Sequence, residues 1–315
     1  MLSGAPVVAE TVFVRREVTL TASHVERFLE ETSRQVDAAL DRLLPSVDQE
    51  PKTLHEAIRY SVFAGGKRFR PALVLASARA CGLDPEAVLP VACAVEAVHT
   101  YSLIHDDLPS MDNADWRRGR PTCHVRYGEA VAVLAGDALH DLAFEWVAAA
   151  SGLGPPERVL RVVQDLAQAL GTGGMVGGQV LDLLAERGRV PADWVPEIHR
   201  RKTGCLIRAC ARVGPILAGR EGDLVCLTAY GEHLGLAFQI TDDVLDVVGD
   251  LEKLGKRTGA DVAASKATYP KVFGLERSRE MARQEAQAAV AALEPLGPRA
   301  ALLADLAWFV VERER

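Results

Sequence analysis

Aromatic residues are scarce in this sequence. They account for 5% of its 315 residues, although apolar residues as a whole reach 49%. The apolar fraction therefore consists mainly of alanine and aliphatic side chains, which together with abundant Leu, Glu and Arg favour helices over strands. Strand alternation, hairpin signals and low-complexity linkers are missing as well. The sequence thus predicts a single all-α domain.

Paired cysteines and an excess of positive charge are also missing. None of the six cysteines forms a CxxC pair, which argues against a structural zinc site or a disulfide framework. We expect reduced cysteines packed as small core residues, and hence a cytoplasmic location. The formal net charge of −7 argues against nucleic acid as a partner.

Segments typical of membrane insertion or export are not found. The longest apolar candidate, Val131–Ala150, is interrupted by Asp137 and Asp141, so it predicts a buried amphipathic helix and no membrane span. The N-terminus shows no basic region followed by an apolar stretch, as a signal peptide would. Because residues 1–20 have no clear helical period, residues 1–22 stay an unassigned extension before a predicted domain of residues 23–315.

The signatures of several enzyme classes are absent too. There is no GxxxxGK[ST] loop and no GxSxG motif, and the glycine-rich run Gly173–Gly178 follows a helical pattern instead of a strand. These absences argue against a P-loop, a Rossmann fold and a serine-nucleophile elbow. The glycine run instead predicts close helix packing or a break before Gln179 and Asp182.

What the sequence does contain is a series of helical patterns. From Ser23, a predicted N-cap with Glu26 completing a capping box, apolar residues recur at helical spacing up to Pro45. Thr53 is expected to cap the next helix. Further helices are predicted over residues 71–81, 85–108, 128–151, 157–171, 192–219, 222–246 and 276–295.

Two aspartate clusters follow apolar helical runs, DDLPSMD at 106–112 and DDVLD at 242–246. Asp242 and Asp246 are four residues apart, so they project from one helix face, one turn apart. In the first cluster Pro109 predicts that the helix bends or ends, which brings Asp112 back toward Asp106. Carboxylates held this close repel each other unless a cation joins them, and oxygen ligands without a His/Cys set favour Mg²⁺ over zinc.

Basic residues flank both clusters. They occur in GGKRFRP at 65–71, Arg117-Arg118, RRKTG at 200–204, Lys256-Arg257 and Lys266. Each group alone is compatible with a solvated surface. Together, in a net acidic protein, they suit two polyanions, because Mg²⁺ shares its coordination with substrate phosphates while Lys and Arg bind phosphate directly.

These motifs resemble those of the trans-prenyltransferase (polyprenyl synthetase) family, and within it the bacterial farnesyl diphosphate synthases. The resemblance runs from about residue 24 to the C-terminus. Its markers are GGKRFRP, VHTYSLIHDDLPSMDNADWRRGRPT at 98–122, GGQVLDL at 177–183, KTG at 202–204, FQITDDVLDVVGD at 238–250, LGKRTGAD at 254–261 and SKATYP at 265–270. It implies an all-α bundle of roughly ten or more helices around a central cavity, as a homodimer.

The resemblance also implies roles for individual residues. Asp106 and Asp112, assisted by Asp107, correspond to one metal-binding motif, and Asp242, Asp243 and Asp246 to the other. Together they would hold about three Mg²⁺ ions, which Mn²⁺ can replace. Allylic diphosphate contacts would come from Arg117, Lys202, Lys256 and Lys266. The isopentenyl diphosphate site would comprise Gly66, Lys67, Arg70, His99 and Arg118, while Thr203 and Gln239 would face the reacting carbons. Asn113 and Ala114 stand where relatives are often acidic, outside the metal-binding positions.

The implied reaction is a head-to-tail condensation of isopentenyl diphosphate with dimethylallyl or geranyl diphosphate. An aromatic residue at the position of Tyr101, next to Ser102, implies a stop at fifteen carbons because its ring fills the space for the next isoprene unit. Alternatives within the family are products of ten or twenty carbons. Alternatives in other classes are a non-catalytic subunit and a terpene cyclase, although a cyclase would not need GGKRFRP for a second diphosphate.

Overall fold

A computed structural model of the chain describes residues 8–189, 191–248 and 268–313. Helices account for nearly all of the regular structure in these ranges, which confirms the all-α class. The main helices are α1 (Val8–Leu43), α2 (Lys52–Val62), α3 (Phe69–Ala80), α4 (Pro85–Asp106), α5 (Cys123–Tyr127), α6 (Glu129–Ala149), α7 (Pro156–Leu170), α8 (Met175–Glu186), α9 (Val195–His199), α10 (Cys205–Ala218), α11 (Glu221–Val248), α14 (Tyr269–Phe273), α15 (Leu275–Ala292) and α16 (Ala301–Glu312).

Shorter elements connect these helices. The 3₁₀ segments are η1 (Ser151–Leu153), η2 (Ala192–Trp194) and η4 (Glu294–Ala300), and a π-helical turn, η3 (Arg200–Gly204), joins α9 to α10. A small antiparallel hairpin of β1 (Trp116–Arg117) and β2 (Arg120–Pro121) follows α4. This hairpin was not predicted, because it is too short to show strand alternation.

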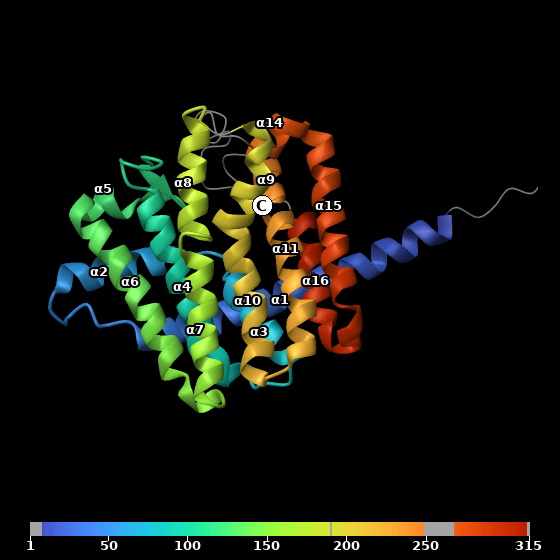
Figure 1. The fold of residues 1–315 in the computed structure, drawn as a ribbon, viewed down its shortest axis with the longest axis horizontal. Coiled ribbons are helices and arrows are strands. Elements are labelled where there is room, and N and C mark those ends of the chain that lie inside the picture. Colours follow the sequence, from blue (N-terminus) through green and yellow to red (C-terminus); the bar gives the residue numbers. More distant parts are fainter. Residues whose placement is uncertain (1–7, 190, 249–267, 314–315) are drawn as a thin grey trace, which may run out of the picture.

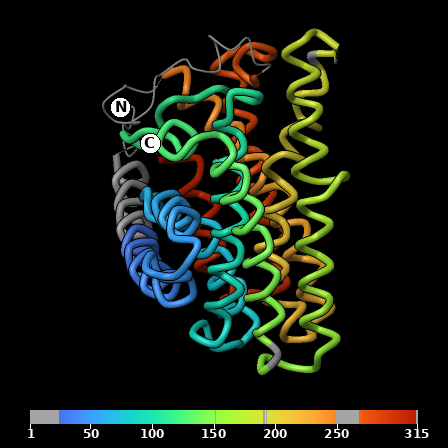
Figure 2. Tube along the Cα trace, turned by 90° about the vertical axis from the view of Figure 1, so that its left-hand side faces the viewer, coloured from blue at the N-terminus to red at the C-terminus, as the bar shows by residue number. Residues whose placement is uncertain are grey.

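The helices form a bundle with α4 inside it. Helix α4 packs against α3 and α6, while α11 packs against α10 and α15. Figure 1 shows α2 and α6 on one side of the bundle, α15 and α16 on the other, and α10 between them. In the turned view of Figure 2, the green and yellow helices run roughly side by side, and the blue N-terminal helices lie to their left at an angle to them. One continuous apolar core joins most of these elements.

Helix α4 is apolar on all sides, which matches its place in the core. Its length and composition alone would allow it to cross a membrane, and it is the one described helix of which this is true. This differs from the sequence analysis, which singled out residues 131–150. Because 72% of its most apolar window is buried inside the protein, the apolar surface of α4 is accounted for by packing against α3 and α6.

Several predicted helix boundaries were wrong. Helix α1 already begins at Val8, so Ser23 is no N-cap. The domain of residues 23–315 stays a prediction. Thr53 lies inside α2, whose N-cap is Pro51. The predicted helix over 192–219 is divided into η2, α9, η3 and α10. Helices α8 and α16 were not predicted. The end of the first segment before Pro45 is confirmed.

The glycine run does allow close packing, as expected. Gly178 lies within α8, and a Cβ atom there would collide with the backbone nitrogen of Lys202 in η3. On the other side of η3, a Cβ on Gly235 of α11 would lie 2.7 Å from the Cα of Gly204. These two glycines let α8 and α11 approach the π-helical turn from opposite sides. The run also contains a break before Gln179, since α7 ends at Leu170 and α8 starts at Met175, after Gly173 and Gly174.

Candidate active site

A cavity of about 420 Å³ lies between α3, α4, α8, the π-helical turn and α11. Many of the predicted site residues line it: Arg70, His99, Tyr101, Ser102, Asp106, Lys202, Thr203, Gln239 and Asp242. The rest of its wall is largely apolar and includes Leu103, Leu206 and Phe238. The fold therefore brings together residues that are up to 172 positions apart, from Arg70 to Asp242, around one space.

The first aspartate cluster adopts the fold-back expected from Pro109. Helix α4 ends at Asp106. The backbone nitrogen of Asp112 donates a hydrogen bond of 2.9 Å to the carbonyl oxygen of Asp106, and that of Asn113 donates one of 3.0 Å to the carbonyl oxygen of Leu108. These bonds return the chain to the helix end, so that Asp112 lies beside Asp106.

Asp107 has a different environment from its neighbours. Its buried carboxylate accepts three hydrogen bonds from the Arg117 guanidinium, at 2.7 to 3.0 Å. Burial raises the pKa of Asp107, and the bonds from Arg117 oppose that shift. Burial likewise lowers the pKa of Arg117, but Asp107 outweighs it and the net shift is upward. Both residues line a separate cavity of about 40 Å³, together with Arg118, so they stand behind the central cavity.

The second aspartate cluster divides between the cavity and the core. Asp242 lines the cavity, and its Oδ1 accepts a hydrogen bond of 2.7 Å from Nη2 of Arg313, at the end of α16. Asp243 and Asp246 are both 2% exposed. Asp243 accepts hydrogen bonds from Nε2 of Gln239 at 3.0 Å and from the backbone nitrogen of Tyr269 at 2.9 Å. Asp243 therefore fixes Gln239 and α14, whereas Asp242 faces the cavity.

The π-helical turn presents Lys202 and Thr203 to the cavity. The Thr203 hydroxyl donates a hydrogen bond of 2.6 Å to Oε1 of Gln239, and Nζ of Lys202 lies 2.7 Å from Oδ2 of Asp182. Burial lowers the pKa of Lys202, but Asp106, Asp182 and Asp112 outweigh it and the net shift is upward. Lys202 therefore stays protonated and lies close to the first aspartate cluster.

Positive charge gathers near the part of the cavity wall formed by Arg70 and His99. Burial lowers the pKa of His99 well below its ordinary value, and the charges of Arg70, Arg118 and Arg117 lower it further. The Arg70 guanidinium lies 5.6 Å from the ring centre of Phe238, and its buried Nε has no hydrogen-bond partner within the described ranges. His99 is thus neutral within a field of arginines that suits an anion.

The glycine-rich loop before α3 completes this positive region. Arg118 donates a hydrogen bond to the carbonyl oxygen of Gly65. Gly66 has a φ of +130°, and a Cβ atom there would lie 2.9 Å from the Arg118 guanidinium. The ammonium group of Lys67 lies 5.4 Å from the ring centre of Phe309 in α16. Glycine at position 66 therefore allows Arg118 to lie against the loop.

Tyr101 and Ser102 both line the cavity. Tyr101 thus lies at the cavity that the resemblance implies it should limit. The ring is held edge-on between His105, at 5.7 Å between ring centres, and His140 of α6, at 5.3 Å. The Ser102 hydroxyl instead bonds back to the carbonyl oxygen of His99 at 2.8 Å. Tyr101 is therefore the bulkier of the two obstacles.

Some candidate residues had not been predicted. Gln179 lines the cavity, and both polar atoms of its buried amide lack a hydrogen-bond partner among the described residues; its place in GGQVLDL was the available signal. Arg68 is 2% exposed and bonds to Glu96 at 2.7 Å and to Asp37 at 2.8 Å. Arg313, which pairs with Asp242, stands in no recognisable pattern.

The donors present fit Mg²⁺ as the expected metal. No three His, Cys, Asp or Glu side chains of the described residues form a metal site by themselves. Asp106 and Asp242 nevertheless offer carboxylate oxygens from two helices to one cavity. A hard cation that keeps water and substrate phosphates among its ligands suits such an incomplete oxygen set. The predicted contacts Lys256 and Lys266 lie outside the described residues.

Comparisons with known proteins agree with this arrangement. A sequence model of the polyprenyl synthetase family matches residues 51–295. Farnesyl diphosphate synthase of Escherichia coli (strain K12) is 45% identical over 293 residues, which cover 91% of this chain and 98% of that protein. The chloroplastic geranylgeranyl pyrophosphate synthase 3 of Arabidopsis thaliana is 48% identical over 289 residues, covering 89% and 79%. The crystal structure of an FPP/GFPP synthase from Zymomonas mobilis superimposes with a TM-score of 0.82 at 38% identity, covering 92% and 99%.

Proposed function

Because this chain belongs to the polyprenyl synthetase family, we propose that it is a Mg²⁺-dependent farnesyl diphosphate synthase. It would join isopentenyl diphosphate head to tail to dimethylallyl diphosphate and then to geranyl diphosphate. The observation that carries the proposal is the division of one cavity into an aspartate region, a region of Arg70 and His99 within the field of Arg117 and Arg118, and an apolar part that contains Tyr101. Two diphosphates and one hydrocarbon chain need these three environments.

The allylic diphosphate would bind at the aspartate region. Asp106, Asp112 and Asp242 are the proposed metal ligands, and Asp243 and Asp246 support the second cluster from the core. Mg²⁺, when bound there, supplies positive charge that stabilises the departing diphosphate. Lys202, kept protonated by its acidic neighbours, would contact the same group. Arg117, held by Asp107, adds positive charge from behind.

The chain's own residues would then favour cleavage of the allylic C–O bond. The apolar wall of Leu103, Leu206 and Phe238 excludes water from the carbocation. The oxygens of Thr203 and Gln239, joined by their bond of 2.6 Å, would face the positive carbon. The double bond of isopentenyl diphosphate attacks that carbon, a new C–C bond forms, and the proton lost in this step passes to the released diphosphate.

The second diphosphate would bind among Lys67, Arg70, Arg118 and the neutral His99. Arg70 has a buried donor without a partner in the described part of the chain, and a phosphate oxygen would satisfy it. This region also distinguishes the proposal from a terpene cyclase, which handles a single diphosphate.

The product length rests on Tyr101. The relatives do not decide it, because farnesyl and geranylgeranyl synthases are similarly identical to this chain. Burying a further five-carbon unit in open space would contribute about 4 kcal/mol, at ~0.8 per carbon, so a steric obstacle is needed to stop growth. The buried Tyr101 ring, held by His105 and His140, supplies such an obstacle. Synthesis of geranylgeranyl or geranyl diphosphate is the alternative.

Release of diphosphate from dimethylallyl diphosphate, with and without isopentenyl diphosphate, tests the reaction class. We expect release to require both substrates and Mg²⁺. Release from the allylic substrate alone would indicate a cyclase or a hydrolase, and no release under any condition would indicate a non-catalytic subunit. The proposal also includes a homodimer in the cytoplasm, and light scattering of the purified protein would test the dimer.

A further inference from the structure

A second cavity, of about 340 Å³, lies on the opposite side of the π-helical turn from the central cavity. Its wall consists of Gly173, Glu197, Arg200, Arg201, Gly204, Cys205, Arg208 and Glu232. None of these residues lines the central cavity. In the π-helical turn, Lys202 and Thr203 face one space while Arg201 and Gly204 face the other. The two cavities are therefore separate sites that share one backbone segment. We call this second space the outer pocket.

The outer pocket has more positive than negative charge. Three arginines face it and only two glutamates. Glu197 already accepts a hydrogen bond of 2.7 Å from Nε of Arg201 and lies 3.8 Å from Nη1 of Arg200. Glu232 meets Arg208 through one contact of 3.4 Å. Two carboxylates thus serve three guanidinium groups, each of which can donate several hydrogen bonds.

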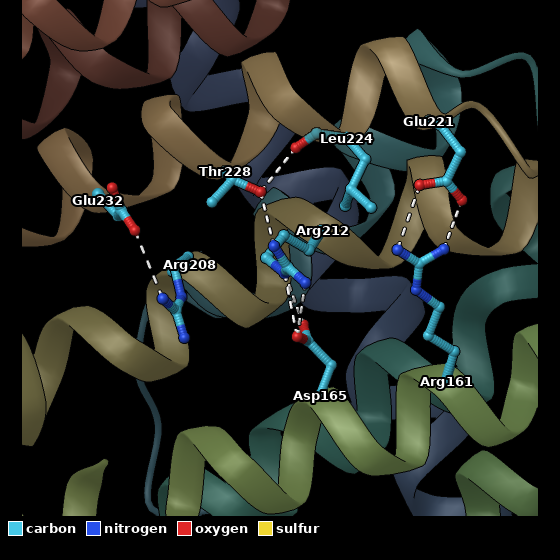
Figure 3. A network of polar contacts seen from close by, with 8 residues as sticks. All are labelled: Arg161, Asp165, Arg208, Arg212, Glu221, Leu224, Thr228 and Glu232. Carbon is cyan, nitrogen blue, oxygen red and sulfur yellow. Dashed lines mark hydrogen bonds and ion pairs between the residues drawn. The ribbon is translucent and has the colours of Figure 1, made fainter. Parts of the chain in front are cut away.

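Arg208 differs from neighbouring arginines on the same outer face. Figure 3 shows Arg212 bonded to both carboxylate oxygens of Asp165 and to Thr228, and Arg161 paired with both oxygens of Glu221. Arg208 has only its long contact to Glu232 in the same view. Its Nε is buried and has no hydrogen-bond partner among the residues that the structure describes. A buried donor of a charged group without a partner is costly unless a ligand satisfies it.

The size and chemistry of the outer pocket favour a small oxyanion. Its volume lies at the lower end of the range typical of ligand sites. Guanidinium groups bind phosphate through paired hydrogen bonds. Apart from glycines and Cys205, the wall residues are charged, and none has an aliphatic or aromatic side chain. The guanidinium groups therefore favour a free phosphate or diphosphate over a prenyl chain.

We propose that the outer pocket is a second anion site, which binds inorganic phosphate or diphosphate through Arg208, Arg201 and Arg200. The site is independent of the two diphosphate positions in the central cavity. The π-helical turn holds both Arg201 and Lys202. An anion bound in the outer pocket would therefore contact the same backbone segment that presents Lys202 to the substrate.

Cys205 provides a local probe of this site, because it lines the outer pocket. Burial raises the pKa of Cys205, while the charges of Arg208 and Arg201 oppose that shift. Cys205 is a partly exposed residue, as is Cys226, which lies outside the pocket. The other four cysteines are buried. Alkylation of Cys205, measured by mass spectrometry of its peptide, therefore reports on occupancy, and Cys226 serves as the internal control.

The test measures alkylation by iodoacetamide at about pH 8.5, near the ordinary thiol pKa, in the full-length protein without Mg²⁺. Inorganic phosphate and inorganic diphosphate are compared with potassium chloride at equal ionic strength. We expect alkylation of Cys205 to slow about tenfold when the anion reaches ten times its dissociation constant, while Cys226 is unaffected. Arg208→Met should abolish the protection, and Arg201→Gln should weaken it. Arg70→Met, in the central cavity, should leave it intact.

Three results would overturn the proposal. The first is a rate for Cys205 that phosphate and diphosphate do not change. The second is equal protection in wild type and Arg208→Met, which would place the anion elsewhere. The third is loss of protection in Arg70→Met, which would assign the effect to the central cavity. The experiment uses no turnover, so its failure leaves the proposed synthase activity standing, and failure of that activity leaves this site standing.

Discussion

Replacing Tyr101 with alanine should move the main product from fifteen to twenty carbons. The Tyr101 side chain is 8% exposed and forms part of the cavity wall. Its ring makes edge contacts with the side chains of His105, which also lines the cavity, and His140. Removing the ring opens space of about the size of one isoprene unit, because both are compact groups of five to seven heavy atoms.

The size of the effect follows from the burial of that unit. Five carbons at ~0.8 kcal/mol each give about 4 kcal/mol. Partial collapse of His105 and His140 into the gap could leave only about a third of this free energy. The remaining ~1.4 kcal/mol still corresponds to a factor of about ten in the product ratio. We therefore expect the ratio of twenty- to fifteen-carbon product to rise at least about tenfold.

The assay is chromatography of dephosphorylated products formed from dimethylallyl and isopentenyl diphosphate. Two matched variants serve as controls. Tyr101→Phe keeps the ring and should still stop at fifteen carbons, and Ser102→Ala removes only a hydroxyl that bonds to the His99 carbonyl. An unchanged fifteen-carbon product from Tyr101→Ala would refute the reasoning and place the obstacle elsewhere, with His140 the next candidate.

Three further predictions concern metal, the second diphosphate and pH. Asp242→Ala should lower kcat at least about 10²-fold with folding intact. The control, replacement of the exposed Asp48 by alanine, should leave kcat unchanged. A near-normal kcat for Asp242→Ala would exclude Asp242 from the metal site. Arg70→Met should raise KM for isopentenyl diphosphate by about ten- to a hundredfold and should raise KM for the allylic substrate less. Replacement of the exposed Arg79 by methionine is the control. Equal effects on both KM values would indicate a structural role for Arg70. Burial lowers the pKa of His199 to about 4. Below pH 6.5 the unfolded chain therefore binds a proton on His199 that the folded protein does not bind, and the free energy of unfolding falls as pH drops. Between pH 6.5 and 4 this loss should reach about 3 kcal/mol in urea unfolding and be smaller in His199→Gln; identical pH profiles would contradict the shift.

The cavity-lining residues could be predicted where local pattern decides their position. Asp106 ends an apolar helix and Pro109 turns the chain back, so the grouping of Asp106 with Asp112 follows from local sequence. Asp242 likewise lies on a helix whose apolar residues face the core. The spacing alone did not show that Asp242 faces the cavity while Asp246 is buried. Which carboxylate reaches the cavity depends on how α11 is rotated against α10 and α15.

Contacts between distant segments could not be predicted. Asp107 was expected to assist the metal, but the hairpin that follows brings Arg117 onto its carboxylate. Arg313 reaches Asp242 across 71 residues, and Lys202 reaches Asp182 across 20. The last two pairs depend on how helical elements pack against each other, which local sequence does not encode.

Arg68 shows that a charged residue in the sequence does not always lie at the surface. Its position in GGKRFRP suggested a phosphate-binding cluster, yet its side chain is 1% exposed and paired with Glu96, which is 3% exposed. Its φ of 49° places the backbone in the left-handed region, which non-glycine residues adopt rarely. Breaking such a buried pair by removing one partner typically costs about 3–5 kcal/mol. Arg68 thereby fixes the loop that carries Gly66 and Lys67.

Mass spectrometry of the product formed from dimethylallyl diphosphate and fully ¹³C-labelled isopentenyl diphosphate tests the central claim most directly. If the cavity holds an allylic diphosphate beside Asp106 and Asp242 and an isopentenyl diphosphate beside Arg70, the main product contains one unlabelled and two labelled five-carbon units, and its formation stops when Mg²⁺ is chelated. A main product with three labelled units would contradict the stop at Tyr101. A product without label, or one formed equally well in excess chelator, would contradict the condensation itself.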